Sequence, residues 1–244
     1  MVGCIALREK RAGNLLRQTP SSVIPIMKIE IWSDIACPWC FVGKRRFESA
    51  LASFPERDAL EIVWRSFELD PNAPASQNAP HAELLANKYR MPVTKAEAML
   101  ETMTATGAAD GITFRFDRAK SGNTFDTHRL AHFAAAHHKR DVMVERLFTA
   151  YFTDGDAMSD HDTLVRLATE VGLDADATRA MFTSVAFAAD VRADEQRAQD
   201  FGITGVPFFA IDEKYAISGA QPSSVIANAL AQAWSEHQPA SSLI

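Results

Sequence analysis

The 244-residue chain is poor in cysteine, with only Cys4, Cys37 and Cys40. It therefore lacks the many spread-out cysteines that define a disulfide-stapled secreted scaffold. No stretch approaches about 20 consecutive apolar residues, so we expect no transmembrane helix and no membrane partner. Positive charge is also scarce, because 25 Lys and Arg stand against 31 Asp and Glu and the formal net charge is −6. Phosphate contacts need clustered cations, so we do not expect nucleic-acid binding.

The first 26 residues lack the features of a secretory signal. Basic residues interrupt their apolar stretches, and no unbroken apolar core with a small-residue cleavage site follows. We expect residues 1–26 to form a flexible extension, with Met27 as an alternative start, and we expect a cytoplasmic protein. Cys4 lies in this extension, and we assign it no function.

The next segment has the pattern of a strand, a helix and a second strand. Residues 27–34 alternate apolar and polar side chains, residues 40–54 place apolar side chains at helical spacing, and residues 61–69 are rich in β-branched and aromatic types. This order predicts a right-handed βαβ unit with two parallel strands.

A helical region follows a proline-containing loop at residues 70–80. Apolar residues recur at helical spacing from about 81 to 172, and a single long helix is predicted over residues 175–201. Two capping-box patterns predict helix starts within the block: Thr94 with Glu97, and Ser159 with Asp162.

Strand patterns return near the C-terminus. Residues 205–211 and 215–218 are predicted strands joined by a tight turn, and a last helix is expected over residues 222–234. The predicted fold class is α/β, with one sheet built from both ends of the chain. Three units follow from this: the extension, a discontinuous sheet domain of residues 27–74 and 175–235, and a helical insertion domain of residues 75–174.

The sequence Cys37-Pro38-Trp39-Cys40 lies between the first strand and its helix. Cys37 is predicted at the N-cap and Pro38 at the first helical position, which favours proline because it has no intrahelical N–H partner. The positive end of the helix stabilises a thiolate at Cys37. We therefore expect Cys37 to be an exposed, attacking thiolate and Cys40 to be the half-buried thiol that resolves a mixed disulfide. Trp39 is expected to shape the substrate groove.

Two other readings of the cysteine pair stay open. Two buried structural cysteines are one, although Pro-Trp at a helix start fits that reading less well. A zinc site is the other, but zinc takes about four nitrogen or sulfur ligands and the chain has no second cysteine pair. We expect no metal site.

A second motif, Gly205-Val206-Pro207, opens a predicted strand. Proline within a strand removes a ladder hydrogen bond, which is tolerated at a sheet edge. A cis Val206–Pro207 bond would instead turn the chain sharply. Both readings are open from the residues alone.

Together, a CPWC motif after the first strand, a helical insertion and Gly-Ile-Thr-Gly-Val-Pro-Phe-Phe resemble the DsbA-like thioredoxin-fold family. The similarity is greatest to its FrnE-like branch, which is related to 2-hydroxychromene-2-carboxylate isomerases and kappa-class glutathione transferases. It covers residues 27–234. The resemblance implies a thioredoxin fold (βαβ…ββα) with a large helical insertion, and a cis Val206–Pro207 bond beside Cys37. It also implies that the backbone of Val206 pairs with an extended peptide or with glutathione.

The resemblance offers two further binding residues. Residues 123–129 match an Asn-Thr pair followed by a helix with His-Arg, so His128 is a candidate to line the cleft, or else a core or solvated histidine. Gln221 lies where glutathione-using relatives bind the γ-glutamyl end, often with an acidic residue. Residues 219–221 contain none, so a simple turn is the alternative.

These observations predict a thiol–disulfide oxidoreductase of the DsbA-like type, a reductase or isomerase acting through a mixed disulfide. Its expected partners are disulfide-containing proteins or low-molecular-weight disulfides. No bound cofactor is expected, and glutathione is a candidate co-substrate. The alternatives are a glutathione-dependent isomerase or transferase acting on aromatic small molecules, and a non-enzymatic binding module. The oligomeric state is left open.

Overall fold

The computed structural model describes residues 26–77 and 79–237. The expectations for residues 1–25, including Cys4, lie outside the described residues.

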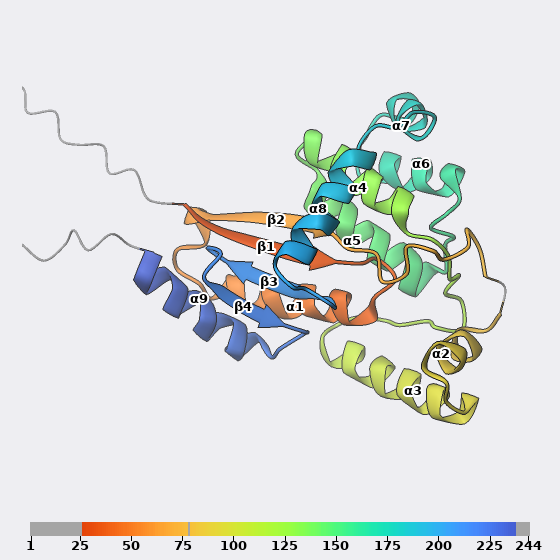
Figure 1. The fold of residues 1–244 in the computed structure, drawn as a ribbon, viewed down its shortest axis with the longest axis horizontal. Helices are drawn as coiled ribbons and strands as arrows, with labels where there is room; N and C mark the ends of the chain where they lie inside the picture. The colour runs from red at the N-terminus through yellow and green to blue at the C-terminus, as the bar shows by residue number, and fades with distance from the viewer. Residues whose placement is uncertain (1–25, 78, 238–244) are drawn as a thin grey trace, which may run out of the picture.

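A four-stranded mixed sheet forms the centre of the described chain, in the order β2-β1-β3-β4 (Figure 1). β1 (Met27–Ser33) pairs in parallel with β2 (Leu60–Ser66), which confirms the βαβ unit. β3 (Phe208–Ile211) pairs antiparallel with both β1 and β4 (Tyr215–Ser218). The sheet is thus assembled from both chain ends, and the α/β class is confirmed.

The two faces of the sheet are covered by different helices. α1 (Pro38–Ala52) and α9 (Ser223–His237) pack together on one face, where the Phe47 and Phe209 rings lie 5.6 Å apart. α8 (Ala188–Asp200) covers the other face near β1 and β2 (Figure 1). A small cluster that includes Trp32 and Ala198 is buried there.

The helices between β2 and α8 form two groups in Figure 1. α2 (His81–Tyr89) and α3 (Val93–Ala109) pack as a pair. α4 (Phe125–Ala136), α5 (Arg140–Thr149), α6 (His161–Glu170) and α7 (Ala175–Phe182) gather beside the sheet, and a π-helical turn, Ala150–Asp154, follows α5. The division into two domains remains a prediction. α7, which that division gives to the sheet domain, packs on α6 and α4.

Aromatic rings join α1 to this helical region. Phe41 stacks on Phe148 at 5.0 Å and meets Phe114 edge-on at 6.2 Å. Phe152 and Phe116 complete the cluster. Such burial of large rings stabilises the contact between the helix that carries the cysteines and the helical region.

The single long helix predicted over residues 175–201 is wrong. α7 ends at Phe182 and α8 begins at Ala188, and Phe187 has a left-handed φ of 61°. The guanidinium of Arg129 donates to the carbonyls of the break, at Met181, Ser184 and Ala186, over 2.7–2.9 Å. A side chain from α4 therefore satisfies backbone groups that a continuous helix would pair internally.

The two capping boxes are also wrong. α3 begins at Val93, so Thr94 already lies within the helix. At α6 the N-cap is Asp160 and not Ser159, because the Asp160 carboxylate accepts from the Thr163 N–H at 3.0 Å. A carboxylate at that position satisfies an unpaired helix N–H.

The predicted hairpin turn is confirmed, with positive φ at Asp212 and Glu213. Strand limits differ from prediction, since β2 ends at Ser66 and β3 begins only at Phe208. None of the helices in residues 26–77 and 79–237 combines the length and apolar character needed to cross a membrane.

Candidate active site

The cysteine pair lies where the sequence predicts, at the end of β1 and the start of α1. Cys37 is the N-cap residue with an extended backbone, and Pro38 occupies the first helical position. The Cys40 N–H donates to the Cys37 carbonyl at 3.0 Å, so the two residues span one turn. Both thiols are free.

The expectation that Cys37 is exposed is wrong. Only 5% of the Cys37 surface is exposed to solvent, and only 1% of the Cys40 surface. The Cys37 Sγ faces the Val206 carbonyl oxygen at 3.6 Å, so the loop before β3 covers it. Burial, together with the adjacent Cys37 sulfur, raises the pKa of Cys40 well above its usual value. Cys40 therefore remains a thiol at neutral pH.

The covering loop contains a cis Val206–Pro207 peptide bond. It approaches α1 closely at Gly43, where an added Cβ would lie 2.8 Å from the Pro207 ring. Only glycine permits this contact without a shift of the loop. The Pro207 carbonyl accepts from the Gly219 N–H at 2.8 Å. Within the described residues the Val206 N–H makes no hydrogen bond.

Asp34 is a site residue that sequence reasoning missed. Its carboxylate accepts from the Leu69 N–H at 2.7 Å and the Ala36 N–H at 3.1 Å, and its carbonyl accepts from the Cys37 N–H at 3.0 Å. Burial alone would raise the pKa of this carboxyl, but the His128 imidazole and these N–H groups hold it below its usual value. Asp34 thus fixes the turn that presents Cys37.

His128 does not line the cleft, which corrects one sequence prediction. It is 4% exposed, and its Nε2 lies 3.6 Å from the Asp34 Oδ1, too far for a hydrogen bond. His128 therefore lies behind Asp34 and reaches the site only through that carboxylate.

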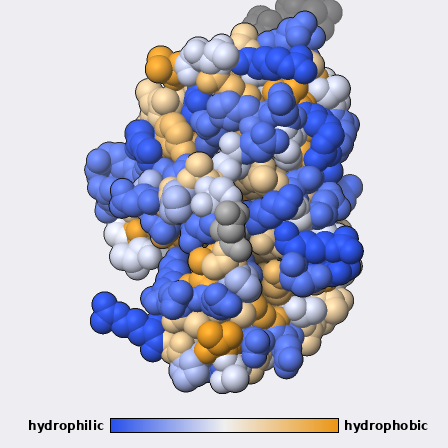
Figure 2. Space-filling view, turned by 90° about the vertical axis from the view of Figure 1, so that its right-hand side faces the viewer, coloured by the Kyte–Doolittle hydropathy of each residue, from blue (hydrophilic) through white to orange (hydrophobic). Residues whose placement is uncertain are grey.

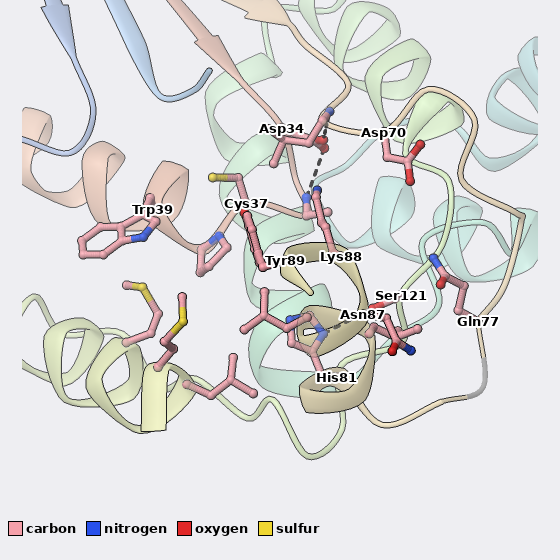
Figure 3. A pocket seen from close by; sticks show the side chains of 18 of the residues that line it. Asp34, Cys37, Trp39, Asp70, Gln77, His81, Asn87, Lys88, Tyr89 and Ser121 are labelled. Carbon is pink, nitrogen blue, oxygen red and sulfur yellow. Dashed lines mark hydrogen bonds between the residues drawn. The ribbon is translucent and has the colours of Figure 1, made fainter. Parts of the chain in front are cut away.

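A cavity of about 1000 Å³ opens beside Cys37 (Figure 3). Pro38 and Trp39 of α1 line it as expected, and Trp39 is 46% exposed. Asp34 and Cys37 lie at one end, and α2 and α3 form the opposite wall. The apolar lining from these two helices comprises Leu84, Leu85, Ala98, Met99, Leu100 and Met103.

A polar group lines another part of the cavity. The Ser121 hydroxyl lies 3.2 Å from the His81 Nδ1 and 3.4 Å from the Tyr151 hydroxyl, as Figure 3 shows for His81 and Ser121. Burial lowers the pKa of His81 and raises the pKa of Tyr151. Both side chains are thus neutral near pH 7.

The structure does not bring the remaining predicted binding residues into this cavity. The Val206 carbonyl lies near the Cys37 Sγ and Pro207 approaches Gly43 of α1, but neither residue lines the cavity. Gln221 donates its amide to the Ser218 carbonyl at 2.9 Å. Gln221 is exposed, as the simple-turn alternative requires.

The α2–α3 lining was missed because each contributing residue is unremarkable in its own helix. The structure shows what the sequence could not, that Tyr89, Val93 and Met99 are exposed apolar residues on α2 and α3. Figure 2, which faces the helical side of the molecule, shows hydrophobic surface gathered in its lower part, where α2 and α3 lie. Exposed apolar surface of this kind marks binding sites.

Comparison with known proteins places this geometry in a family. The profile of the DSBA-like thioredoxin domain matches residues 28–231. An uncharacterized Bacillus subtilis protein, YwbO, is 31% identical over 204 residues, which cover 83% of this chain and 94% of the relative.

Solved structures agree. The crystal structure of a probable DsbA oxidoreductase from Streptomyces coelicolor is 45% identical, with a TM-score of 0.84, and the match covers 89% of this chain and 94% of that one. A 2-hydroxychromene-2-carboxylate isomerase shares the fold at 15% identity, with a TM-score of 0.62 over 86% of this chain and 97% of that one. The similarity thus extends across the sheet and the helical region together. The chain belongs to the DSBA-like thioredoxin domain family.

Proposed function

We propose that the protein is a thiol–disulfide oxidoreductase in which Cys37 attacks the substrate and Cys40 resolves the mixed disulfide. The observation that carries this proposal is the asymmetry of the pair. Cys37 caps α1 and lines the cavity, while Cys40 is buried and its pKa is raised. A thiol that lines the cavity and a second thiol buried behind it can divide the work of a two-step exchange.

The reaction balances in two steps. The Cys37 thiolate attacks one sulfur of a disulfide, a Cys37–substrate bond forms, and the other substrate sulfur leaves as a thiolate that takes up a proton. Cys40 then loses its proton and attacks the Cys37 sulfur, which releases the second substrate thiol. The substrate gains two electrons, and the cysteine pair becomes a disulfide.

The position of Cys37 at the start of α1 supports the first step, because the positive end of the helix stabilises negative charge there. Val206 supports substrate placement, since its N–H is unpaired within the described residues and its carbonyl faces the Cys37 sulfur. An extended peptide or glutathione would pair with these groups.

The proposed substrates are protein or low-molecular-weight disulfides, with glutathione as the proposed co-substrate. The proposed direction is reduction or isomerisation in the cytoplasm, where a reducing glutathione pool keeps such a pair as a dithiol.

The second candidate function is a glutathione-dependent isomerase or transferase acting on aromatic molecules. The apolar cavity beside Cys37 favours it. Two free cysteines one turn apart favour the first candidate, because an enzyme that only activates the glutathione thiol has no use for a resolving cysteine.

The test measures reduction of 2-hydroxyethyl disulfide by a dithiol, with the purified full chain. Cys37→Ser should reduce the rate to background, whereas Cys4→Ser, which removes the third thiol, should retain full turnover. Incubated with 2-hydroxyethyl disulfide in the absence of the dithiol, Cys40→Ser should accumulate a substrate adduct on Cys37, visible by intact mass spectrometry. Full turnover in Cys37→Ser contradicts the proposal. Glutathione-dependent conversion of an aromatic substrate that survives this substitution would establish the second candidate.

A further inference from the structure

We propose that the cavity beside Cys37 selects low-molecular-weight disulfides with an aromatic or otherwise apolar body, in preference to polypeptide disulfides and to charged ones such as glutathione disulfide. The inference rests on the proposed function and names the substrate class of that same site.

The apolar wall of the cavity favours an apolar substrate. Aliphatic and thioether side chains from two consecutive helices face the cavity, and Trp39 of α1 lines it as well. Met99 is 42% exposed and Trp39 is 46% exposed, so large apolar surfaces remain uncovered beside the thiol. Burying them against a ligand is favourable, at roughly 25 cal/mol per Å² of apolar surface. Methionine also adapts its shape to flat aromatic groups.

Size and access form the second argument. The volume of about 1000 Å³ lies at the upper end of the range for small-molecule sites, about 300–1000 Å³. Cys37 is 5% exposed, so a substrate must enter the cavity to reach it. A polypeptide can pair with the backbone of Val206, but most of it would stay outside a cavity of this volume and would gain little from the apolar lining.

The distribution of charge is the third argument. The charged lining residues Asp70, Lys88 and Lys95 are exposed, so their charges are solvated. The buried carboxylate of Asp34 is already occupied by two backbone N–H groups. The described lining thus offers no buried ion-pair partner for the ammonium and carboxylate groups of glutathione.

The polar group formed by His81, Ser121 and Tyr151 gives the cavity a site for one polar group of the substrate. His81 stacks on Phe116 with centroids 5.3 Å apart, which fixes the imidazole in place. These neutral donors and acceptors suit a hydroxyl or carbonyl group on an otherwise apolar substrate.

For a disulfide R–S–S–R′ the overall exchange consumes one substrate and two enzyme thiols and yields RSH, R′SH and the Cys37–Cys40 disulfide. A dithiol reductant regenerates the enzyme in turnover. A single turnover of the pre-reduced protein needs no added reductant, so it reports the selectivity of the site alone.

The experiment compares two probes that differ in one arm, benzyl 2-hydroxyethyl disulfide and bis(2-hydroxyethyl) disulfide. Glutathione disulfide and insulin serve as the charged and the polypeptide probe. Each single-turnover rate is divided by the rate of the same probe with free dithiothreitol, which removes intrinsic reactivity. We expect the benzyl probe to be favoured by about tenfold over every other probe, the order of effect that burial of one aromatic group produces.

Two substitutions on α3 locate the selectivity. Met99→Asp places a charge in the apolar wall and should reduce the benzyl preference to near one. Ala105→Asp adds the same charge at an exposed α3 position outside the lining, and the preference should remain at the wild-type value. Both positions are exposed, so neither substitution buries a charge in the core.

Three results would overturn the inference: a normalised benzyl preference near one, faster normalised reduction of insulin or glutathione disulfide than of the benzyl probe, or an unchanged preference in Met99→Asp. Each of these leaves Cys37-dependent turnover intact, and so leaves the proposed function standing. Absence of Cys37-dependent reduction with all four probes would instead overturn the proposed function.

Discussion

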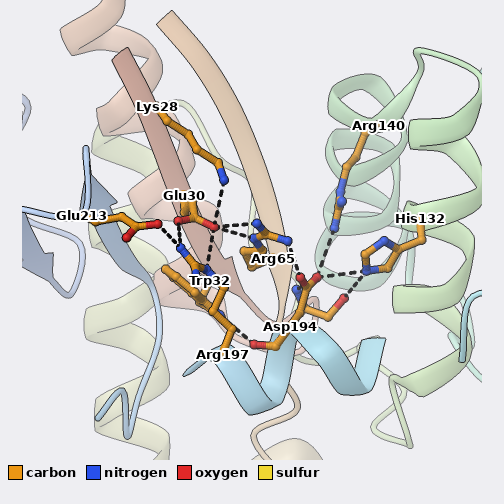
Figure 4. Close-up of polar contacts among 10 residues, drawn as sticks. Lys28, Glu30, Trp32, Arg65, His132, Arg140, Asp194, Arg197 and Glu213 are labelled. Carbon is orange, nitrogen blue, oxygen red and sulfur yellow. Dashed lines mark hydrogen bonds and ion pairs between the residues drawn. The ribbon is translucent and has the colours of Figure 1, made fainter. Parts of the chain in front are cut away.

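The two faces of the sheet at β1 differ in the chemistry that attaches their helices. Ile29 and Ile31 lie in the large apolar core with α1 and α9. Glu30 and Trp32 point to the opposite face, where ion pairs and a hydrogen bond from the Trp32 indole N–H to the Asp194 carbonyl hold α8 (Figure 4). The cysteine pair follows directly after this strand, so both kinds of packing determine its position.

The ionic face is built around two buried carboxylates. Glu30 accepts hydrogen bonds from Arg65 and Arg197 over 2.6–2.9 Å. Asp194 of α8 accepts from Arg65 at 2.8 Å and from the Ser66 N–H at 2.9 Å. His132 and Arg140 approach the same carboxylate at 3.0 and 3.9 Å. Burial lowers the pKa of Arg140 to about 10.

The two faces hold their helices in different ways, one through non-directional apolar burial and the other through paired charges of fixed geometry. Apolar burial is non-directional and holds α1 against the sheet without defining each contact. Paired carboxylates require fixed geometry, because a buried charge that loses its partner is costly. α8 ends at Asp200, and the chain then runs to the loop that covers Cys37. The ion network therefore fixes α8, the helix from which the chain runs into this loop.

Loss of Asp194 from the ionic face should destabilise the protein most. Asp194→Ala removes the acceptor for Arg65, His132 and the Ser66 N–H. It takes the nearby carboxylate from the half-buried Arg140, whereas Arg65 keeps its pair with Glu30. The free energy of unfolding should fall by about 3–5 kcal/mol, measured by urea denaturation. Asp176→Ala is the matched control, because its pair with Arg179 is exposed and should contribute about 0–1 kcal/mol. Equal losses in the two variants would show that the network is not what holds α8.

An intermediate effect is expected at Asp34, beside the thiol. Asp34→Asn replaces one carboxylate oxygen, the acceptor for either the Leu69 or the Ala36 N–H, and should lower the free energy of unfolding by about 1–3 kcal/mol at pH 7. The pKa of Asp34 is depressed in the folded state, so its contribution is present above the unfolded-state pKa and is lost as the pH falls through the folded value.

Urea denaturation between pH 7 and pH 3 tests how the stabilising contribution of Asp34 depends on pH. Glu30 and Asp194 also have lowered pKa values and destabilise both proteins on acidification. The difference in the free energy of unfolding between wild type and Asp34→Asn should therefore become smaller below about pH 4, near the ordinary carboxyl pKa. Asp70→Asn, at an exposed carboxylate of the same cavity, is the control and should show no such narrowing. If this difference stayed constant with pH, it would contradict the lowered pKa of Asp34 in the folded protein.

Local patterns were sufficient to predict the elements that carry the cysteines. Pro38 at the first helical position and alternation along β1 are short-range signals, and both were confirmed. The hairpin at Asp212 and Glu213 is equally local. The family resemblance added the thioredoxin fold, which no single segment specifies.

Features that depend on distant contacts could not be predicted. The break between α7 and α8 is stabilised by Arg129, which lies on α4. The burial of Cys37 depends on the Val206 loop, and the cavity depends on α2 and α3 packing opposite α1. In each case the decisive partner lies far away in the sequence, where helical or strand periodicity carries no information.

A mild loss of stability is expected on the apolar face of β1. Ile31→Val removes one buried methylene group from β1 and should lower the free energy of unfolding by about 0.5–1.5 kcal/mol. Ile62→Val on β2, where the side chain is partly exposed, should cost less. The apolar face is redundant, because many other contacts remain when a single group is removed. Asp194, by contrast, is the acceptor that several groups of its network share. If Ile31→Val destabilised the protein as much as Asp194→Ala in the same urea titration, the two faces would be equally sensitive to the loss of a single group, and the contrast between them would fail.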